Sequence, residues 1–415
     1  MSESAKVVVI GAGISGLAAA AALSPYCSNV TIIEKADSAS ENEVRRHVPQ
    51  GSHIHILLQA GLNSLDELLP GFSEILIREG SAVINGGEGL QIYQFGSWTP
   101  LQRLPLEFLG QSRPFLEKIL RDCIKQKNNI LFIRGAVNNI VVDSSGKVTH
   151  LITNENEPPL TADIVVDATG ASAKLFSQFK IEVPVNRLKI NIFYSTLHFN
   201  KPSDYIKHKE NILIVPEPGT SNLGGSLIDI ENNQWCISLH GRDKCPIPGD
   251  VSEWKELAHQ LPDQRIWQRI ESLDPIAPLK TFKKAESVWR RFDLVSELPE
   301  GYLPIGDLIN SLNPIYGQGM TIALGHALAL RDLVRMNRKI SVDKKFQEEY
   351  FSAALTWTQK AWKKAEEFEK NFSLNDEKQL KRLEMLKKIV AATNKRAEID
   401  KQVHLKIVKE AQMLK

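Results

Sequence analysis

Two glycine-rich segments, far apart in the chain, carry residue types that could hold a dinucleotide. Gly11, Gly13 and Gly16 form a GxGxxG pattern behind the apolar run 6–10, and Glu34 follows roughly 20 residues later. Such glycines allow a tight turn, close approach of a pyrophosphate and close packing of a helix on a strand, and the helix N-terminus favours the anion. A carboxylate at Glu34 would accept hydrogen bonds from ribose hydroxyls, and its negative charge would disfavour a 2′-phosphate. The segment therefore predicts a dinucleotide site that is not built for NADP; the alternative is a glycine-rich turn without a ligand.

The second segment, residues 301–320, contains Gly306-Asp307 between an expected strand and a helix expected from Thr321. An aspartate after a strand can accept a hydrogen bond from a ribityl hydroxyl. The run 313–320 leads into the helix N-terminus, whose positive end would stabilise negative charge on a reduced flavin. The alternative is an unrelated loop punctuated by glycine.

A third signal is the apolar strand 162–168, which ends in Ala168-Thr169-Gly170. This turn could bring the backbone close to the AMP half of a bound flavin, although any buried strand followed by a turn has the same pattern. Taken in order, the three segments favour FAD over NAD as the bound dinucleotide.

The elements around these motifs predict an α/β fold. Apolar strands at 6–10 and 29–33 flank an alanine-rich helix at 14–23, which is a βαβ unit of a parallel sheet. Helices are predicted at 57–69 and 114–127, the second capped by Ser112. Runs at 130–133, 140–142 and 148–153 predict a strand meander. Short β-type runs between 188 and 283, with helices near 251–261 and 263–273, predict an inserted antiparallel lobe.

These elements predict a discontinuous FAD-binding domain of the Rossmann type (glutathione-reductase-like) over 1–180 and 290–340. An antiparallel β substrate lobe covers 181–289 together with a hairpin at 89–105, and a helical tail covers 341–415. Residues 361–415 carry 14 Lys and Arg against 9 Asp and Glu, so the tail is basic. Two interpretations of the tail stay open: helices docked by their apolar side, or a peripheral membrane or partner contact.

The bulk composition excludes other classes. The 415 residues are 42% hydrophobic and 24% charged, which suits a buried core, and a net charge of +2 gives no argument for nucleic-acid binding. Four cysteines without a CxxC pair are typical of reduced thiols, and the pair His53 and His55 supplies too few ligands for a metal. Neither a signal peptide nor a membrane span is expected, which predicts a cytoplasmic protein. The protein is expected to be a monomer or a dimer.

The three motifs, in this order, resemble the flavin monooxygenases of the para-hydroxybenzoate hydroxylase fold. The segments 46–61, 112–117, 235–241 and 313–320 are similar to a bacterial branch that includes polyketide epoxidases, themselves similar to squalene epoxidases. The resemblance implies that NADPH or NADH reduces bound FAD and that O2 adds to form a C4a-hydroperoxide. An oxygen atom then passes to an alkene or aromatic ring of a hydrophobic secondary metabolite, by epoxidation or hydroxylation. Because the flavin carries this chemistry, no catalytic acid–base pair is required.

The resemblance also implies site residues. Arg113 resembles the family arginine near the FAD phosphates, or is a surface arginine at a helix start. Arg46 resembles the arginine near the adenosine and pyrophosphate, with Arg45 an equal candidate by chemistry. His53 and His55, two apart, would share one face of an extended segment that could approach the flavin; the alternative is a pair of structural histidines bonded to backbone.

The predicted site falls into two groups. The residues expected near the flavin ring are His53, His55, Pro314, Tyr316 and Gly317. The predicted cofactor-binding residues are Gly11, Ala12, Gly13, Ile14, Ser15, Gly16, Glu34, Lys35, Arg45, Arg46, Arg113, Val137, Ala168, Thr169, Gly170, Gly306, Asp307, Pro314, Gly317, Gln318, Gly319 and Met320.

Two features depart from the family. Lys174 only partly substitutes for the basic residue that usually follows Asp-Ala-Thr-Gly. The run 96–100 does not match the WxWxIP motif of flavin-dependent halogenases, which speaks against halogenation. Two other activities stay open, a flavin-dependent reductase of prenyl double bonds and a cyclase or binding protein in which FAD is structural.

Overall fold

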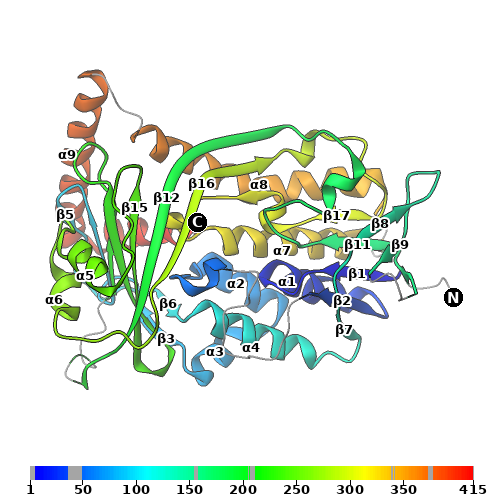
Figure 1. Ribbon diagram of the computed structural model, residues 1–415, viewed down its shortest axis with the longest axis horizontal. Helices are drawn as coiled ribbons and strands as arrows, with labels where there is room; N and C mark the ends of the chain where they lie inside the picture. Colours follow the sequence, from blue (N-terminus) through cyan, green and yellow to red (C-terminus); the bar gives the residue numbers. More distant parts are fainter. Residues whose placement is uncertain are drawn as a thin grey trace.

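The computed structural model describes residues 5–35, 49–153, 158–203, 205, 211–337, 340, 342–372 and 377–414. Figure 1 shows a parallel sheet at the right and a larger sheet at the left, with long helices above them. The parallel sheet has the order β17-β11-β1-β2-β7. Its strands are β1 (Val7–Ile10), β2 (Val30–Glu34), β7 (Ile130–Arg134), β11 (Ile164–Asp167) and β17 (Tyr302–Pro304). β1 lies in the middle and is buried along its whole length, which explains its uninterrupted apolar sequence.

The predicted strand meander is correct only in part. β8 (Asn139–Val142), β9 (Val148–Ile152) and β10 (Leu160–Thr161) form a three-stranded antiparallel sheet. β7 instead runs parallel to β2, from the pair Val30 and Ile130 to the pair Glu34 and Arg134. The reason is topological: β7 returns from helix α4 (Arg113–Lys125), and such a crossover delivers a strand parallel to its neighbour.

Helices cover the parallel sheet and carry the turns of interest. α1 (Ile14–Leu23) packs on α7 (Gly319–Asn337), and its run of alanines lets the two helices approach closely. α2 (Gln59–Leu68) and α3 (Phe72–Glu79) follow the 49–58 segment. α4 begins as expected, because the Ser112 hydroxyl accepts a hydrogen bond from the Phe115 N–H at 3.2 Å.

The larger sheet has the order β18-β16-β12-β15-β14-β13-β4-β5 and is antiparallel except between β13 and β4. One face packs on α5 (Val251–His259) and α6 (Arg265–Ile270), where Trp254 and Leu197 are fully buried. The other face carries Tyr194, Thr196 and His198, because side chains alternate along a strand. The strands are β4 (Leu90–Gln94), β5 (Ser97–Trp98), β12 (Val185–Asn200), β13 (Asn211–Ile214), β14 (Leu223–Ile230), β15 (Gln234–Arg242), β16 (Lys280–Arg290) and β18 (Asn310–Ser311).

β12 and β16 form a long ribbon that joins the two sheets, as the arched strand in Figure 1 makes visible. They pair from Val185 with Arg290 to Thr196 with Lys280, and the register shifts between Lys189 and Ile192. The stretch of chain from β12 to β16 therefore begins and ends at two strands that pair with each other. A small separate sheet pairs β3 (Ala82–Asn85) with β6 (Glu107–Gly110).

The tail consists of α8 (Lys344–Lys370), α9 (Glu377–Ile399) and α10 (Lys401–Ala411). α8 starts at Asp343, whose carboxylate accepts from the Phe346 N–H at 2.9 Å, and it buries Tyr350, Phe351 and Trp362 in the main core. α8 is thus docked by its apolar side. Among the described residues, no helix combines the length and apolar character needed to cross a bilayer.

The observed architecture confirms the predicted fold class: a Rossmann-type parallel sheet, an antiparallel β lobe and C-terminal helices.

The packing of α1 on its own turn gives a first prediction. A Cβ at Gly16 would lie 1.8 Å from the Gly11 carbonyl oxygen, a collision with backbone that no rotamer relieves. We expect Gly16→Ala to lower the free energy of unfolding by about 3 kcal/mol or more, measured by urea denaturation. Gly249→Ala, where the nearest atom is the end of the flexible Glu253 side chain, is the control. Equal free energies of unfolding for the two variants would contradict the close packing of Gly16 on the Gly11 carbonyl.

Candidate functional site

The three predicted segments meet at the carboxyl ends of β1, β11 and β17 of the parallel sheet. Gly11 has φ +100°, and a Cβ there would lie 2.8 Å from the Ala168 carbonyl oxygen. Gly306 has φ +66°, and a Cβ there would lie 2.2 Å from the Ser15 hydroxyl. Both positions combine a left-handed backbone with a contact that excludes a side chain, so both turns require glycine. The two glycine turns form one continuous backbone cradle.

A carboxylate stands near each turn. One Glu34 oxygen accepts from the Ala12 N–H at 2.8 Å, and the Glu34 carbonyl accepts from the Gly135 N–H at 2.9 Å. The second bond holds the loop that contains Val137 beside Glu34, while Lys35 is exposed. Asp307 is partly buried, and one of its oxygens lies 3.9 Å from where a Cβ on Gly319, the first residue of α7, would stand.

Two residues that the sequence did not single out, the buried His326 and the partly buried Lys284, hold the second turn and the residues after it. The His326 Nδ1 accepts from the Gly306 N–H at 3.3 Å, and its Nε2 lies 3.0 Å from the Thr358 hydroxyl. Burial lowers the pKa of His326 to about 3, so the ring is neutral and able to accept. Lys284 donates to the Ser311 hydroxyl and the Leu312 carbonyl, each at 2.7 Å. Burial lowers the pKa of Lys284, and the nearby charge of Asp307 opposes that shift.

The Ala168-Thr169-Gly170 turn is fixed by Asp167 at the end of β11. Its carboxyl accepts from the Thr169 N–H at 3.0 Å, the Thr169 hydroxyl at 2.6 Å and the Tyr302 hydroxyl at 2.7 Å. Burial raises the pKa of Asp167. Lys174 is exposed beyond this turn.

The loop ahead of α7 is ordered by a side-chain cap. The Asn313 Oδ1 accepts from the Ile315 N–H at 3.1 Å and thereby starts the short 3-10 turn Pro314–Tyr316. Gly317 follows with φ +63°, and Gln318 and Met320 are buried. The Gln318 Oε1 is buried without a hydrogen-bond partner among the residues that the structure describes.

A cavity of about 650 Å³ opens between the 51–56 segment, the start of α4 and the inner face of the larger sheet. His53 and Gln111 contribute buried polar atoms to it that have no partner in the described part of the chain: the His53 Nε2 and both amide atoms of Gln111. Gln111, which the sequence analysis missed, is only 3% exposed. The remaining lining is mixed. Its apolar part includes Ile54, Ile56, Phe115, Ile119, Ile228, Ile230, Ile276 and Pro278, and its polar part includes Glu79, Lys118, His198, Glu231, Gln234 and Lys280.

The two histidines of the 51–56 segment behave differently. The His53 Nδ1 lies 2.7 Å from the Thr196 hydroxyl, so this side chain reaches the lobe. The His55 Nδ1 lies 2.8 Å from the His53 carbonyl, which is the backbone bond of the structural alternative. Burial, and then nearby His198, lower the pKa of His53 to about 4. Burial, and then nearby Arg113, lower the pKa of His55 to about 3.

Arg113 is largely buried rather than a surface arginine. Its Nε donates to a Glu117 oxygen at 2.6 Å, and its side chain is 14% exposed. Arg45 and Arg46 lie outside the described residues. Within the described ranges, no three His, Cys, Asp or Glu side chains converge as ligands for a metal ion.

Comparison with known proteins places this geometry in context. Residues 9–58 match the NAD(P)-binding Rossmann-like domain family. Protein Rv3254 of Mycobacterium tuberculosis is 29% identical over 347 residues, which are 78% of this chain and 72% of the relative. PqsL, a probable FAD-dependent monooxygenase from Pseudomonas aeruginosa, superposes with a TM-score of 0.64 at 16% identity, over 91% of this chain and 99% of PqsL. The Diels–Alderase PyrE3 of pyrroindomycin biosynthesis gives 0.69 at 14% identity, over 99% of this chain and 81% of PyrE3.

The chain therefore has the fold of the flavin-dependent monooxygenases, which confirms the resemblance inferred from its motifs at the level of the fold.

The neutral buried histidines predict a dependence of stability on pH. A histidine whose pKa is lowered in the folded state takes up a proton on unfolding, so folding weakens as pH falls from about 6.5 toward 4. We expect His53→Gln to remove up to about 1.4 kcal/mol per pH unit of this loss in that window. Urea unfolding at pH 5, 6 and 8 measures it.

At pH 8 the His53 ring is neutral in both the folded and the unfolded state. The difference in free energy of unfolding between variant and wild type at this pH therefore reports lost contacts and not protonation. Parallel curves for the two proteins down to pH 5 would refute the assignment of a neutral, buried His53.

Proposed function

We propose that this protein is an FAD-dependent monooxygenase that uses NAD(P)H and O2 to transfer one oxygen atom to a hydrophobic small molecule. The observation that carries the proposal is the contact between the two glycine turns. It sets the N-termini of α1 and α7 in one cradle, with Glu34 by one turn and Asp307 by the other. An extended cofactor with a pyrophosphate in its middle and a polyhydroxyl chain on one side fits such a cradle.

Each part of the cradle has a role in this proposal. The backbone N–H groups after Gly11 and the positive end of α1 bind the pyrophosphate, and Glu34 accepts the ribose hydroxyls. Asp307 accepts a ribityl hydroxyl. The N-terminus of α7 at Gly319 stabilises negative charge on the ring. Outside the cradle, in the 650 Å³ cavity, Gln111 offers a ligand a donor and an acceptor, since its amide atoms have no partner among the described residues.

Bound FAD, once reduced by NADPH or NADH, would supply the chemistry that activates O2 and delivers one oxygen atom. The protein's own task is to orient the substrate and exclude water. The isoleucines and Phe115 of the 650 Å³ cavity support a substrate with a hydrophobic part, and the charged side chains beside them support polar groups on it. His53 is neutral, its Nε2 has no partner among the described residues, and it is placed to hydrogen-bond such a group. Epoxidation of a secondary metabolite is the specific reaction that we favour.

One comparison favours a second candidate. PyrE3 shares this fold and is named a Diels–Alderase, and a cycloaddition requires no net oxidation. A cyclase in which FAD is structural would turn over with the flavin held oxidised and O2 removed, whereas a monooxygenase would stop.

The cofactor assignment is tested at Asp307. Loss of a charge-assisted hydrogen bond costs about 1.5–3 kcal/mol, so we expect Asp307→Ala to bind FAD at least about tenfold more weakly in a fluorescence titration, with the fold retained by circular dichroism. Asp274→Ala, at an exposed carboxylate of the lobe, is the matched control. Wild-type affinity in Asp307→Ala would remove Asp307 from the site.

The reaction class is tested separately and without a known substrate. The FAD-loaded protein is reduced anaerobically with dithionite and mixed with air-saturated buffer. We expect the oxidised flavin absorbance to return within seconds, because the proposed site exposes reduced flavin to O2. A flavin that stays reduced for many minutes would overturn the monooxygenase proposal and leave the cofactor assignment standing.

A further inference from the structure

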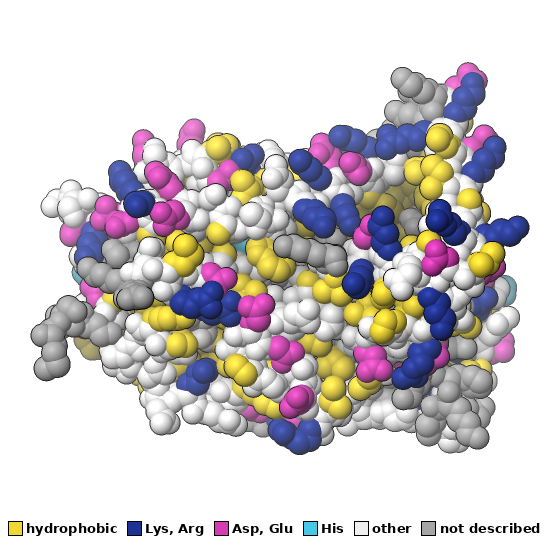
Figure 2. Space-filling view, turned by 180° about the vertical axis from the view of Figure 1, so that it is seen from behind, with side chains coloured by type: hydrophobic (Ala, Val, Ile, Leu, Met, Phe, Trp, Pro, Cys, Tyr) yellow, Lys and Arg dark blue, Asp and Glu magenta, His cyan; other side chains and the backbone are white. Residues whose placement is uncertain are grey.

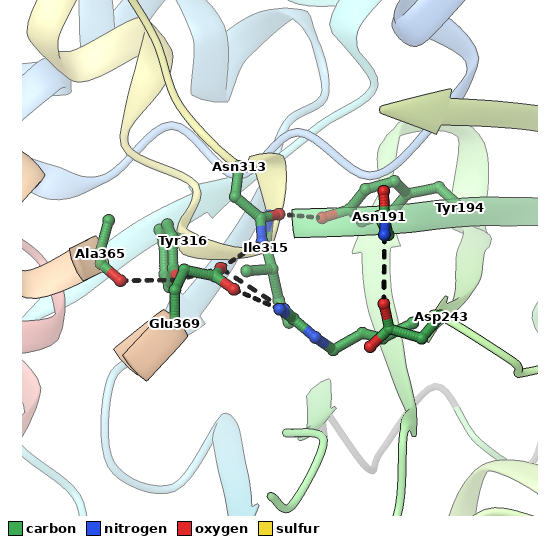
Figure 3. Close-up of polar contacts among 9 residues, drawn as sticks. Asn191, Tyr194, Asp243, Asn313, Ile315, Tyr316, Ala365 and Glu369 are labelled. Carbon is green, nitrogen blue, oxygen red and sulfur yellow. Dashed lines mark hydrogen bonds and ion pairs between the residues drawn. The ribbon is translucent and has the colours of Figure 1, made fainter. Parts of the chain in front are cut away.

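A buried polar network surrounds Glu369, near the end of α8, and Figure 3 shows its members converging. The carboxylate accepts from the Asn313 Nδ2 at 3.0 Å and from the Tyr316 hydroxyl at 2.7 Å. It also forms an ion pair with Arg242 of β15 through both terminal nitrogens of the guanidinium. The Arg242 and Glu369 side chains are 2% and 6% exposed, so the pair is withdrawn from water.

Asn313 connects this network to the loop ahead of α7. Its Oδ1 accepts from the Tyr194 hydroxyl at 2.9 Å and from the Ile315 N–H at 3.1 Å, while its Nδ2 donates to Glu369. With two donors facing its Oδ1 and a carboxylate acceptor facing its Nδ2, the amide has a single orientation that satisfies its partners. That orientation is the one that starts the 3-10 turn leading to α7.

Glu369 therefore joins three parts of the molecule. α8 contributes the carboxylate, the 313–316 loop contributes two donors, and the larger sheet contributes Arg242 and Tyr194 (Figure 3). Burying two charges is costly unless the pair also satisfies its hydrogen bonds, as this pair does through Asn313 and Tyr316. Stability alone would be served as well by apolar side chains, so the network calls for a further role.

We propose that Glu369 is a positioning residue for the flavin-ring end of the site, acting through Asn313. By fixing the Asn313 amide, it sets the path from Pro314 to Gly317 and hence the N-terminus of α7. Its negative charge also balances Arg242 beside that loop. The inference rests on the proposed function for the identity of the cofactor, but the contacts themselves do not.

The test compares two glutamates of α8. Glu369→Gln removes the charge and leaves Arg242 unbalanced, which favours the reduced, more negative flavin. We expect FAD affinity to fall about tenfold or more and the midpoint potential of bound FAD to become more positive. Glu366→Gln, at an exposed carboxylate paired with Lys370 at 3.2 Å, is the control and should match wild type in both measurements.

A double variant covers the case in which Glu369→Gln does not fold. Glu369→Gln with Arg242→Met removes both buried charges, so it should fold, yet it still leaves the Asn313 amide without its carboxylate. Its FAD affinity should stay low. Wild-type affinity in a folded Glu369→Gln or double variant would overturn the inference, and so would a wild-type potential in folded Glu369→Gln. Failure of the wild-type protein to bind FAD would instead overturn the proposed function.

A second inference concerns α9 and rests on different observations. Leu383, Asn394 and Ala397 face the protein, and the Asn394 Nδ2 donates to the Ser97 hydroxyl at 2.9 Å. On the opposite side, Met385 and Ile399 are 64% and 86% exposed. We define the outer face of α9 by helical spacing; it consists of Glu377, Lys381, Met385, Lys388, Ile389, Ala392, Lys395, Arg396 and Ile399. It holds four basic residues and one acidic residue, Glu377, which pairs with Lys381 at 2.8 Å, so the face carries a net positive charge.

Figure 2 shows dark blue cations beside hydrophobic groups over α9 at the upper right, with a few magenta acidic groups among them. An apolar strip flanked by lysine and arginine is the pattern of a helix that lies in a lipid interface, where the strip enters the acyl boundary and the cations meet anionic head groups. We propose that the outer face of α9 binds the surface of an anionic lipid bilayer.

Vesicle co-sedimentation tests this surface. We expect binding to phosphatidylcholine vesicles that contain phosphatidylglycerol and little binding to phosphatidylcholine alone. Met385→Ser with Ile389→Ser, and separately Lys388→Glu, should each weaken binding about tenfold. Met336→Ser, at a 76% exposed methionine on α7, is the control. Absence of wild-type binding, or equal loss in Met336→Ser, would overturn the proposal, as would self-association through this face without lipid.

Discussion

The contact between Gly306 and Ser15 is the constraint on which the arrangement of this site depends. It presses the turn after β17 against the first turn of α1, with no room for a side chain between them. The contact requires β17 to lie in the same parallel sheet as β1, separated from it only by β11. It also requires α7 to pack beside α1. His326 secures the arrangement from the far side by accepting from the Gly306 N–H.

The site is therefore built by residues from three parts of the chain. The nucleotide domain supplies the glycine turns, the lobe supplies Thr196 and Arg242, and the tail supplies Glu369. The parts are connected by buried contacts: the hydrogen bond between His53 and Thr196, and the ion pair between Arg242 and Glu369. Buried polar contacts of this kind are strong only when every partner is present, so the three parts of the chain specify the site together.

A feature of this molecule could be predicted from the sequence where its cause is local in the chain, and could not where its cause is a contact between distant residues. Gly11 and Gly306 could be predicted because each turn makes a local demand on the backbone that few other residues meet. His326 and Glu369 could not, because a histidine or glutamate inside a helix gives no local signal and its partner lies far along the chain. Gln111 could not, because a glutamine between β6 and α4 gives no local sign that its side chain is buried. The parallel pairing of β7 was missed for the same reason, since an apolar run of four residues fits either neighbour.

The paired ends of β12 and β16 have a consequence for how such proteins diversify. Val185 lies opposite Arg290, so the stretch 185–290, which supplies five of the eight strands of the larger sheet, begins and ends at two paired strands. A recombination event that replaced this stretch would exchange most strands of the larger sheet in one step and leave the glycine turns intact. The larger sheet and the glycine turns are thereby separable units of inheritance in this architecture, linked through the contacts of Thr196 and Arg242.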